Sequence, residues 1–271
     1  MSRARAGIDP GRSIRFALLR LLALACLSLG AAPPSFAQGG PPMLTDDPGT
    51  PGNGRLEINT AYLEHRSGQD RVRSFPHVDF NYGLGDHIQL KYETGWIFAA
   101  SPDGREARNG LDNSLFGLKW RFLDQETSGV DMSTYPQLHL ENNNRSAARG
   151  VANPGPNLFL PVSIARRFGR TAVLVEVGYQ YSRILPDEWV FGLLGAFYWS
   201  EDLELLAEVR RFSETLHSRA DVVANVGLRR ALGPGFRLLA SIGTGVSNGP
   251  EVTRFIAYLG IQMMLGDKPE P

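Results

Sequence analysis

The chain has 271 residues, a formal net charge of +0 and 42% hydrophobic residues. Because it has no basic excess to offset phosphate charges, nucleic acid is not expected as a partner. Beyond the N-terminal region no stretch of about 18 uncharged apolar residues occurs, so no membrane-spanning helix is expected in the mature chain. A β-barrel is not excluded in this way, because its apolar residues are diluted by polar ones.

The N-terminal residues 1–37 have the pattern of a cleaved secretory signal peptide. Arginines, from Arg3 onward, precede an apolar segment (FALLRLLALACLSL, 16–29), and small residues permit cleavage after Ala37. The single cysteine, Cys26, lies inside this segment, so no disulfide is expected in the mature chain. We disfavour an uncleaved anchor helix. We also disfavour a lipoprotein acylated at Cys26, because Ala23 stands where that signal requires leucine.

The remaining chain divides into three parts. Residues 38–53 (QGGPPMLTDDPGTPGN) are rich in Gly and Pro and predict an irregular lead-in on the periplasmic side. Residues 54–265 alternate between apolar and polar side chains, and residues 266–271 form a polar tail.

The alternation is clearest in residues 78–96, which surround a turn at Gly85-Asp86. Successive strand side chains point to opposite faces, so this stretch predicts a β-hairpin with one apolar and one polar face. Similar segments recur about twelve times, joined alternately by longer and shorter connections. They predict an all-β fold, a closed antiparallel up-and-down transmembrane β-barrel. Pro136 weakens the expected strand 130–141, because proline cannot donate to the ladder.

A soluble barrel would show the same alternation with its faces reversed. Three observations favour the membrane: bulky aromatics are too frequent for a small soluble core, no helix is predicted to cover a sheet edge, and aromatic residues recur near strand ends, as in interface girdles. We therefore expect the outer membrane of a Gram-negative bacterium. The girdle candidates are Tyr62, Trp96, Trp120, Tyr181 and Trp199.

The polar face would line a lumen narrower than that of porins with sixteen or more strands, suited to small or slender apolar solutes. Charges of both signs could either hold the barrel as ion pairs or form a selective constriction. His77 and His139 are too few and too isolated to indicate a metal, and no cofactor is expected. The candidates for the solute path are Asp79, Lys91, Glu93, Lys119, Arg121, His139, Glu176, Glu208 and Arg210.

The leading hypothesis is a channel or transporter, and two alternatives remain. One is a closed structural or adhesive barrel that acts through the loops at 99–110 and 142–156. The other is a lipid-modifying enzyme, which needs a serine within hydrogen-bond reach of a histidine. Ser133 is six residues from His139, about 20 Å along a strand, and the register of Ser163 is not fixed by the pattern. We expect no enzymatic activity. The expected partners are outer-membrane lipid, a small solute and, during biogenesis, the barrel assembly machinery.

Four motifs carry a family resemblance. Residues 40–48 (GPPMLTDDP) resemble the opening box of an outer-membrane transporter family of the "MetA-pathway of phenol degradation" type. Residues 117–122 (GLKWRF), 206–208 and 225–228 are similar to later strands of that family. The resemblance implies passage of small molecules, aromatic or hydrophobic ones among them. One departure is that many such barrels end on an aromatic residue read by the assembly machinery, whereas this chain continues past Leu265.

Overall fold

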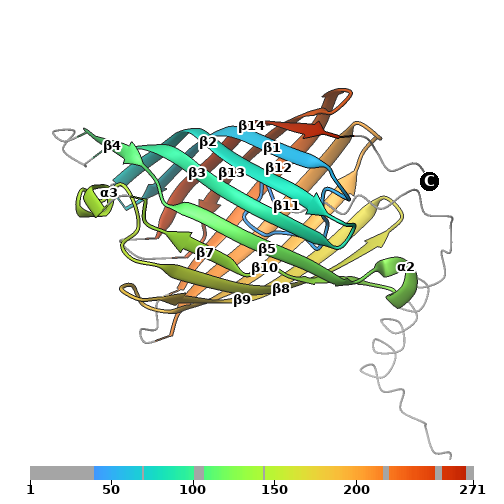
Figure 1. Cartoon of the computed structure of the whole chain (residues 1–271), viewed down its shortest axis with the longest axis horizontal. Coiled ribbons are helices and arrows are strands. Elements are labelled where there is room, and N and C mark those ends of the chain that lie inside the picture. Colours follow the sequence, from blue (N-terminus) through green and yellow to red (C-terminus); the bar gives the residue numbers. More distant parts are fainter. Residues whose placement is uncertain are drawn as a thin grey trace, which may run out of the picture. The chain divides into compact units, whose positions relative to one another are not determined.

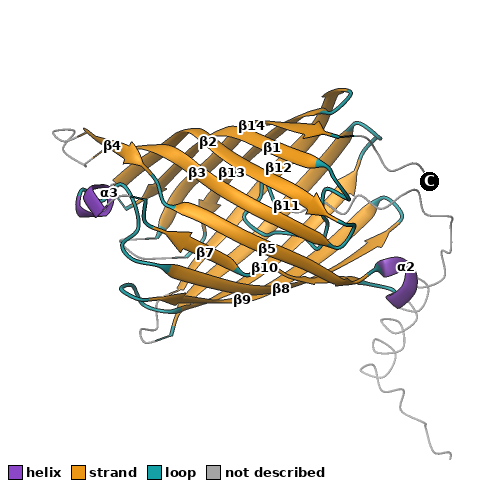
Figure 2. Ribbon diagram, in the orientation of Figure 1, coloured by secondary structure: helices purple, strands orange, loops and turns teal. Residues whose placement is uncertain are grey.

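The computed structural model describes residues 40–68, 70–100, 107–142, 144–215, 220–247 and 252–266. The predicted signal peptide and most of the tail lie outside these residues. The described chain forms one antiparallel sheet of fourteen strand elements, with two short helices in connections at opposite ends of the sheet (Figures 1 and 2). No helix in this described part is long and apolar enough to cross a membrane.

The elements follow one another along the chain. The strands are β1 (Leu56–Ser67), β2 (Asp70–Leu84), β3 (Ile88–Ala100), β4 (Ala107–Leu111), β5 (Ser114–Leu123), β6 (Asp131–Thr134), β7 (Gln137–Leu140), β8 (Asn157–Phe168), β9 (Thr171–Ser182), β10 (Glu188–Tyr198), β11 (Leu203–Glu214), β12 (Ala220–Gly233), β13 (Phe236–Gly245) and β14 (Thr253–Leu265). Helix α2 (Gln125–Ser128) connects β5 to β6, and α3 (Asn144–Ala148) connects β7 to β8.

The sheet closes on itself. β1 pairs with β14 along its whole length, from Leu56 opposite Leu265 to Ser67 opposite Thr253. β4 and β5 both pair with β3, and β6 and β7 both lie between β5 and β8, so each of these pairs forms one interrupted strand. The described wall therefore has twelve strand positions and closes into a ring, which confirms the predicted closed up-and-down barrel, and only the short β4 at the long-loop end has a partner on one side alone.

The break between β6 and β7 lies at the predicted weak point. The expected continuous strand 130–141 stops at Thr134 and resumes at Gln137, because Pro136 has no N–H to donate to the ladder. The proline carbonyl stays paired, accepting a hydrogen bond from Leu118 N at 3.0 Å. The strand is thus interrupted at Pro136, but a main-chain hydrogen bond to β5 is kept there.

A second break corrects another expectation. The predicted strand 111–123 divides at Asp112-Asn113, where Asp112 N donates instead to Gly95 O at 2.9 Å. The predicted polar loop at 99–110 is shorter than expected, because β3 extends to Ala100 and β4 begins at Ala107.

The two faces of the wall have opposite chemistry. Leu193, Val226 and Trp120 on the outer face are more than half exposed, whereas Asp79 and Glu176 on the inner face are only 1% exposed. Soluble monomers rarely expose a contiguous apolar surface of this extent. The soluble alternative, which needs the reversed arrangement, is therefore wrong. Four of the five girdle candidates are exposed on the outer face: Trp96, Trp120, Tyr181 and Trp199.

One bulge on β2 changes which residues face inward. Its residues Phe75 and Pro76 together oppose a single residue on each neighbouring strand, Tyr62 on β1 and Trp96 on β3. Phe75 in the bulge is 55% exposed, while Ser74 is buried and both Ser74 and His77 line the lumen. Bulges characteristically re-aim side chains in this way, often beside functional sites.

Candidate functional site

Residues 40–49, which we call the plug, fold into the barrel lumen (blue in Figure 1). At the base of the plug, Gly54 N donates to Gly83 O and Gly83 N donates to Arg55 O, both at 2.9 Å. Thr45 in the plug is fully buried. The segment predicted as a periplasmic lead-in is irregular and starts from the end of the barrel with short turns, but it folds inward because its main-chain groups find partners on the lumen wall.

Glu208 on β11 holds the centre of the plug. Its carboxylate accepts the main-chain N–H groups of Leu44, at 3.0 Å, and Thr45, at 2.7 Å. Asn225 on β12 donates to the same carboxylate at 3.2 Å. Arg210 Nη1 donates to Leu44 O at 2.6 Å. Hydrogen bonds to charged groups contribute about 1.5–3 kcal/mol each, so these two side chains alone hold the plug firmly.

Two further predicted lumen residues contact the acidic part of the plug. Lys119 Nζ lies 2.9 Å from Asp46 Oδ1 and 3.0 Å from Gly49 O. Glu176 accepts the main-chain N–H of Asp46 at 3.3 Å and forms an ion pair with Arg210 at 2.7 Å. The structure thus brings Lys119, Glu176, Glu208 and Arg210 together around one segment.

The sequence analysis did not select the residues that hold the start of the plug. Arg229 donates to Pro41 O and Gly40 O, both at 3.0 Å, and to Glu204 Oε2 at 3.1 Å. Ser241 Oγ donates to Pro42 O at 2.7 Å. Glu204 and Arg229 are directly opposite each other in the β11–β12 register. An opposite-charge cross-strand pair on the polar face was the signal that could have identified them.

The plug also has an apolar contact with the wall. Met43 is buried in a cluster that includes Leu174, Leu194 and Leu206 from β9, β10 and β11. Gly192 on β10 leaves space for Thr45, because a Cβ atom built there would collide with the Thr45 hydroxyl. The inner wall is therefore not uniformly polar, and it is shaped to fit this segment.

A second charged network lies on β2 and β3, nearly half the barrel circumference from Glu208. Lys91 Nζ lies 2.8 Å from Glu93 and 3.3 Å from Asp79, and His77 Nε2 lies 3.3 Å from Glu93. Asn81 donates to Asp79 at 3.0 Å. The predicted residues Asp79, Lys91 and Glu93 therefore form a paired internal network, which satisfies the buried charges.

The last two predicted lumen residues lie outside both networks. Arg121 forms an ion pair with Asp124 at 2.8 Å near the short-turn end of the barrel. His139 is partly buried and faces Asn157 in the β7–β8 register, whereas Ser133 and Ser163 face each other farther along β8. No hydrogen bond joins His139 to either serine, so the hydrolase alternative gains no geometric support.

A cavity of about 510 Å³ lies in the lumen on the long-loop side of the plug. The plug residues Pro42, Met43 and Leu44 contribute to its floor. Polar groups from β2 and β3 meet apolar side chains from several strands around it. The volume falls within the range of small-molecule pockets. Its apolar walls include Ile97, Leu115, Phe159, Val190 and Phe212.

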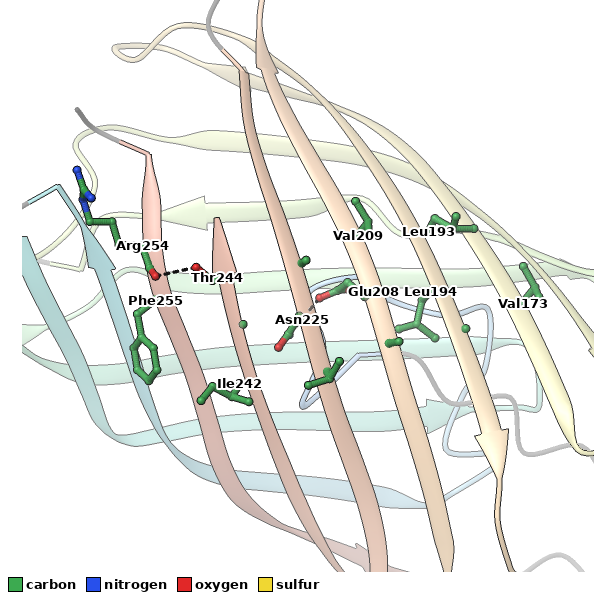
Figure 3. A pocket seen from close by; sticks show the side chains of 15 residues that line it. Val173, Leu193, Leu194, Glu208, Val209, Asn225, Ile242, Thr244, Arg254 and Phe255 are labelled. Atoms are coloured by element: carbon green, nitrogen blue, oxygen red, sulfur yellow. Dashed lines mark hydrogen bonds between the residues drawn. The ribbon is translucent and has the colours of Figure 1, made fainter. Parts of the chain in front are cut away.

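A second hollow, of about 910 Å³, spans the outer face of strands β9 to β14 (Figure 3). Small residues such as Ala207 and Ala224 lie between exposed Leu193, Val209 and Val226. Figure 3 shows its residues spread over neighbouring strands, with Thr244 Oγ1 donating to Arg254 O at the edge. The polar side chains of Glu208 and Asn225 meet on the lumen side of these strands, where they hold the plug, so they supply no catalytic group to this outer hollow.

Two adjacent carboxyl groups in the plug have opposite pKa shifts. Burial raises the pKa of Asp47 to about 7, with repulsion from Asp46 adding to the increase and attraction to Lys119 opposing it. Burial acts on Asp46 as well, but attraction to Lys119 and Lys91 outweighs it and holds the Asp46 pKa below its ordinary value. Among the described residues, no group of three or more His, Cys, Asp or Glu side chains could hold a metal ion.

Comparisons with solved structures place the fold. The COG4313 outer-membrane channel from Pseudomonas putida F1 is similar at a TM-score of 0.58 and 12% identity, over 87% of this chain and 100% of that one. The NanC porin matches at a TM-score of 0.55 and 9% identity, over 77% and 98% of the two chains. The KdgM porin matches at a TM-score of 0.54 and 11% identity, over 76% of this chain and 98% of that one. No family model and no curated protein sequence matches the chain.

The fold and the lumen together define a closed twelve-strand antiparallel barrel with an internal plug, and it shares its fold with outer-membrane channels. The predicted resemblance to a phenol-pathway transporter family has no matching family model.

Proposed function

We propose that the protein is an outer-membrane channel for small molecules in a Gram-negative bacterium, and that its plug restricts passage. The observation that carries the proposal is the cavity of about 510 Å³ enclosed by the barrel wall and floored by the plug. A solute entering from the long-loop side reaches this cavity first. To go further it must displace residues 40–49 or pass beside them.

The membrane location rests on the outer face. Apolar side chains cover most of it, and the ion pairs of Lys91 with Asp79 and Glu93 and of Arg210 with Glu176 lie inside. A lysine or arginine facing lipid at mid-depth costs about 2–4 kcal/mol, and the inward position of Lys91, Lys119 and Arg210 avoids this cost. In this proposal lipid is the permanent partner, and the barrel assembly machinery acts during insertion.

The solute class follows from the cavity walls. Apolar groups such as Ile97, Phe159 and Phe212 favour a molecule with an aromatic or aliphatic body. The resemblance of residues 40–48 to the phenol-pathway transporters supports the same class. We therefore propose small aromatic or hydrophobic molecules as the solutes.

The test is ion conductance in planar bilayers, with the full mature chain compared to a variant lacking residues 40–49. The wild-type barrel should conduct weakly, and deletion of the plug should raise its conductance several-fold because the lumen loses its obstruction. The Gly195→Ala variant serves as a control, since a Cβ atom at this position contacts nothing within 4 Å. A deletion variant that inserts but remains non-conducting would instead favour the closed structural barrel.

A further inference from the structure

We propose that Ser74, His77 and Tyr258 form a hydrogen-bonding recognition site in the lumen cavity for an uncharged apolar molecule that carries a hydroxyl group. The inference rests on the proposed channel function and specifies which solutes its cavity selects. It begins from three polar atoms, Ser74 Oγ, His77 Nδ1 and Tyr258 OH, which are buried without a hydrogen-bond partner. All three residues line the cavity on the long-loop side of the plug.

The sheet register places two of these groups in one row. Ser241, Tyr258, Leu63 and Ser74 occupy opposed positions on β13, β14, β1 and β2. Ser241 at one end of this row donates to the plug at Pro42 O, so this end of the row lies at the cavity floor. Tyr258 and Ser74 are two strand spacings apart, roughly 10 Å, with Leu63 between them. This distance accommodates a small ring lying against Leu63.

The bulge on β2 brings His77 to the same region. A Cβ atom built at Gly95 on β3 would lie 3.2 Å from His77 Nδ1 and would collide with Ser74 Oγ. The two polar atoms therefore approach the same point of the wall. Ser74 and His77 are three residues apart and would face opposite sides of a regular strand, but in the bulge Phe75 and Pro76 together oppose one residue, so both side chains face inward.

The unmatched atoms specify the chemistry of the ligand. His77 Nε2 faces the Glu93 carboxylate at 3.3 Å, so this nitrogen carries a hydrogen, while Nδ1 accepts a hydrogen bond in the neutral ring and donates one in the charged ring. A ligand hydroxyl fits either form, because it can both donate and accept, as can the Ser74 and Tyr258 hydroxyls. An unmatched buried polar atom costs about 1–3 kcal/mol, so a ligand hydroxyl that reaches these groups relieves a cost already present in the empty site.

Charge complementarity disfavours an anionic ligand. The two lysine and arginine side chains that line the cavity are already paired within the protein, Lys91 with Glu93 and Asp79, and Arg210 with Glu176. An anion entering the cavity would lose its hydration without gaining a free counter-charge. The apolar walls formed by residues such as Ile97 and Val190 accept a hydrocarbon body instead.

The experiment measures binding, not transport. The mature protein in nanodiscs is titrated with para-trifluoromethyl benzyl alcohol and with para-trifluoromethyl toluene, which lacks the hydroxyl group, and fluorine NMR follows each probe against empty nanodiscs. Wild type should bind the alcohol at least about fivefold more tightly, the value of one hydrogen bond. Tyr258→Phe and Ser74→Ala should each remove most of this preference and leave toluene binding unchanged.

The matched control is Ser133→Ala. Ser133 Oγ is also buried without a hydrogen-bond partner, but Ser133 does not line the cavity, so this variant should keep the preference. If wild type binds the two probes equally, or binds neither, this result alone overturns the proposal, whatever the variants do. A full preference retained in both Tyr258→Phe and Ser74→Ala also overturns it.

Failure of this inference is distinguishable from failure of the channel proposal. A hydroxyl preference in a barrel whose conductance does not respond to removal of the plug supports the recognition site and contradicts the channel. Plug-dependent conductance without a hydroxyl preference supports the channel and contradicts the recognition site.

Discussion

At the scale of single residues, Gly192 is the position where the wall and the plug fit most closely. A valine there would place its side chain where Thr45 lies. Overpacking costs about 1–3 kcal/mol, and here release of the plug relieves it more easily than distortion of the wall. We predict that Gly192→Val raises single-channel conductance in planar bilayers.

The control for this variant lies on the same strand. A Cβ atom at Gly195 meets nothing within 4 Å, so Gly195→Val should conduct like wild type. If both valine variants conduct equally, the close fit of Thr45 against Gly192 does not hold the plug.

Asp47 should make docking of the plug depend on pH. In a released, hydrated segment its pKa returns towards 3.8, whereas in the docked plug burial raises the pKa to about 7. The docked state therefore binds a proton that the released state loses. Docking is strongest at low pH and weakens as the pH rises through about 7. The groups around this carboxyl are Lys119, Asp46, Arg229 and the N–H of Gly49.

The measurable result is conductance that increases between about pH 4 and pH 7 and then levels off. Asp47→Asn removes the titrating group, so this variant should stay weakly conducting over the whole range. A pH response that persists in the Asn variant would assign it to another group.

At the scale of the elements, the interruption between β6 and β7 depends on a glycine. Tyr135, just before Pro136, is 1% exposed and packs over Gly117 on β5. Its hydroxyl accepts a hydrogen bond from Gln89 at 3.1 Å, and Lys119 Nζ lies 4.7 Å from its ring centre. A methyl group at Gly117 would lie 2.8 Å from the Tyr135 ring.

We predict that Gly117→Ala destabilises the barrel by about 1–3 kcal/mol, because Tyr135 cannot move without exposing the gap in the ladder at Pro136. The measurement is the temperature at which the barrel unfolds in detergent. Gly195→Ala should leave that temperature unchanged, and an equal loss in both variants would show that the effect is general to glycines in strands.

The alternation of side chains along a strand explains which parts of the site were predictable from sequence. Along an uninterrupted strand the side of each residue follows from its neighbours, so the alternation is enough to place Lys119, Glu176 and Glu208, which are buried, on one face. The alternation of inward and outward side chains is broken at a bulge, where two residues oppose one residue of the partner strand. Ser74 could not be assigned to the lumen from sequence, because the shift at Phe75-Pro76 is set by tertiary pairing with β1 and β3.

The plug was not predictable for a different reason. Residues 40–49 have no periodicity, and their partners are far away in sequence: Thr45 binds Glu208, 163 residues away. The Gly and Pro content correctly indicated an irregular segment. Its position depends on a closed wall that exists only once β1 has met β14.

At the scale of the whole molecule, the wall should survive loss of the plug. Strand pairing around the ring does not include residues 40–49, and Glu176–Arg210 and Glu204–Arg229 remain paired without them. We predict that a variant lacking these residues still shows heat-modifiable migration on a detergent gel after outer-membrane fractionation. Its unfolding temperature should be lower, since Glu208 loses its two main-chain donors.

Wild type should show the same two gel positions, folded without heating and unfolded after boiling. Migration that does not change on heating would contradict a closed barrel, because it is the continuous ring of main-chain hydrogen bonds that resists detergent.

The attachment at Gly83 limits how far an undocked plug can travel. Residues 50–53 join the plug to Gly54 and Arg55, which are bonded to the end of β2. Fully extended, the fourteen residues from Gly40 to Asn53 reach at most about 50 Å. Its lumen partners therefore meet it at a millimolar effective concentration, whatever the amount of protein in the membrane. Recapture is unimolecular, so each opening should be brief, and its duration should be the same for one barrel in a bilayer as for many.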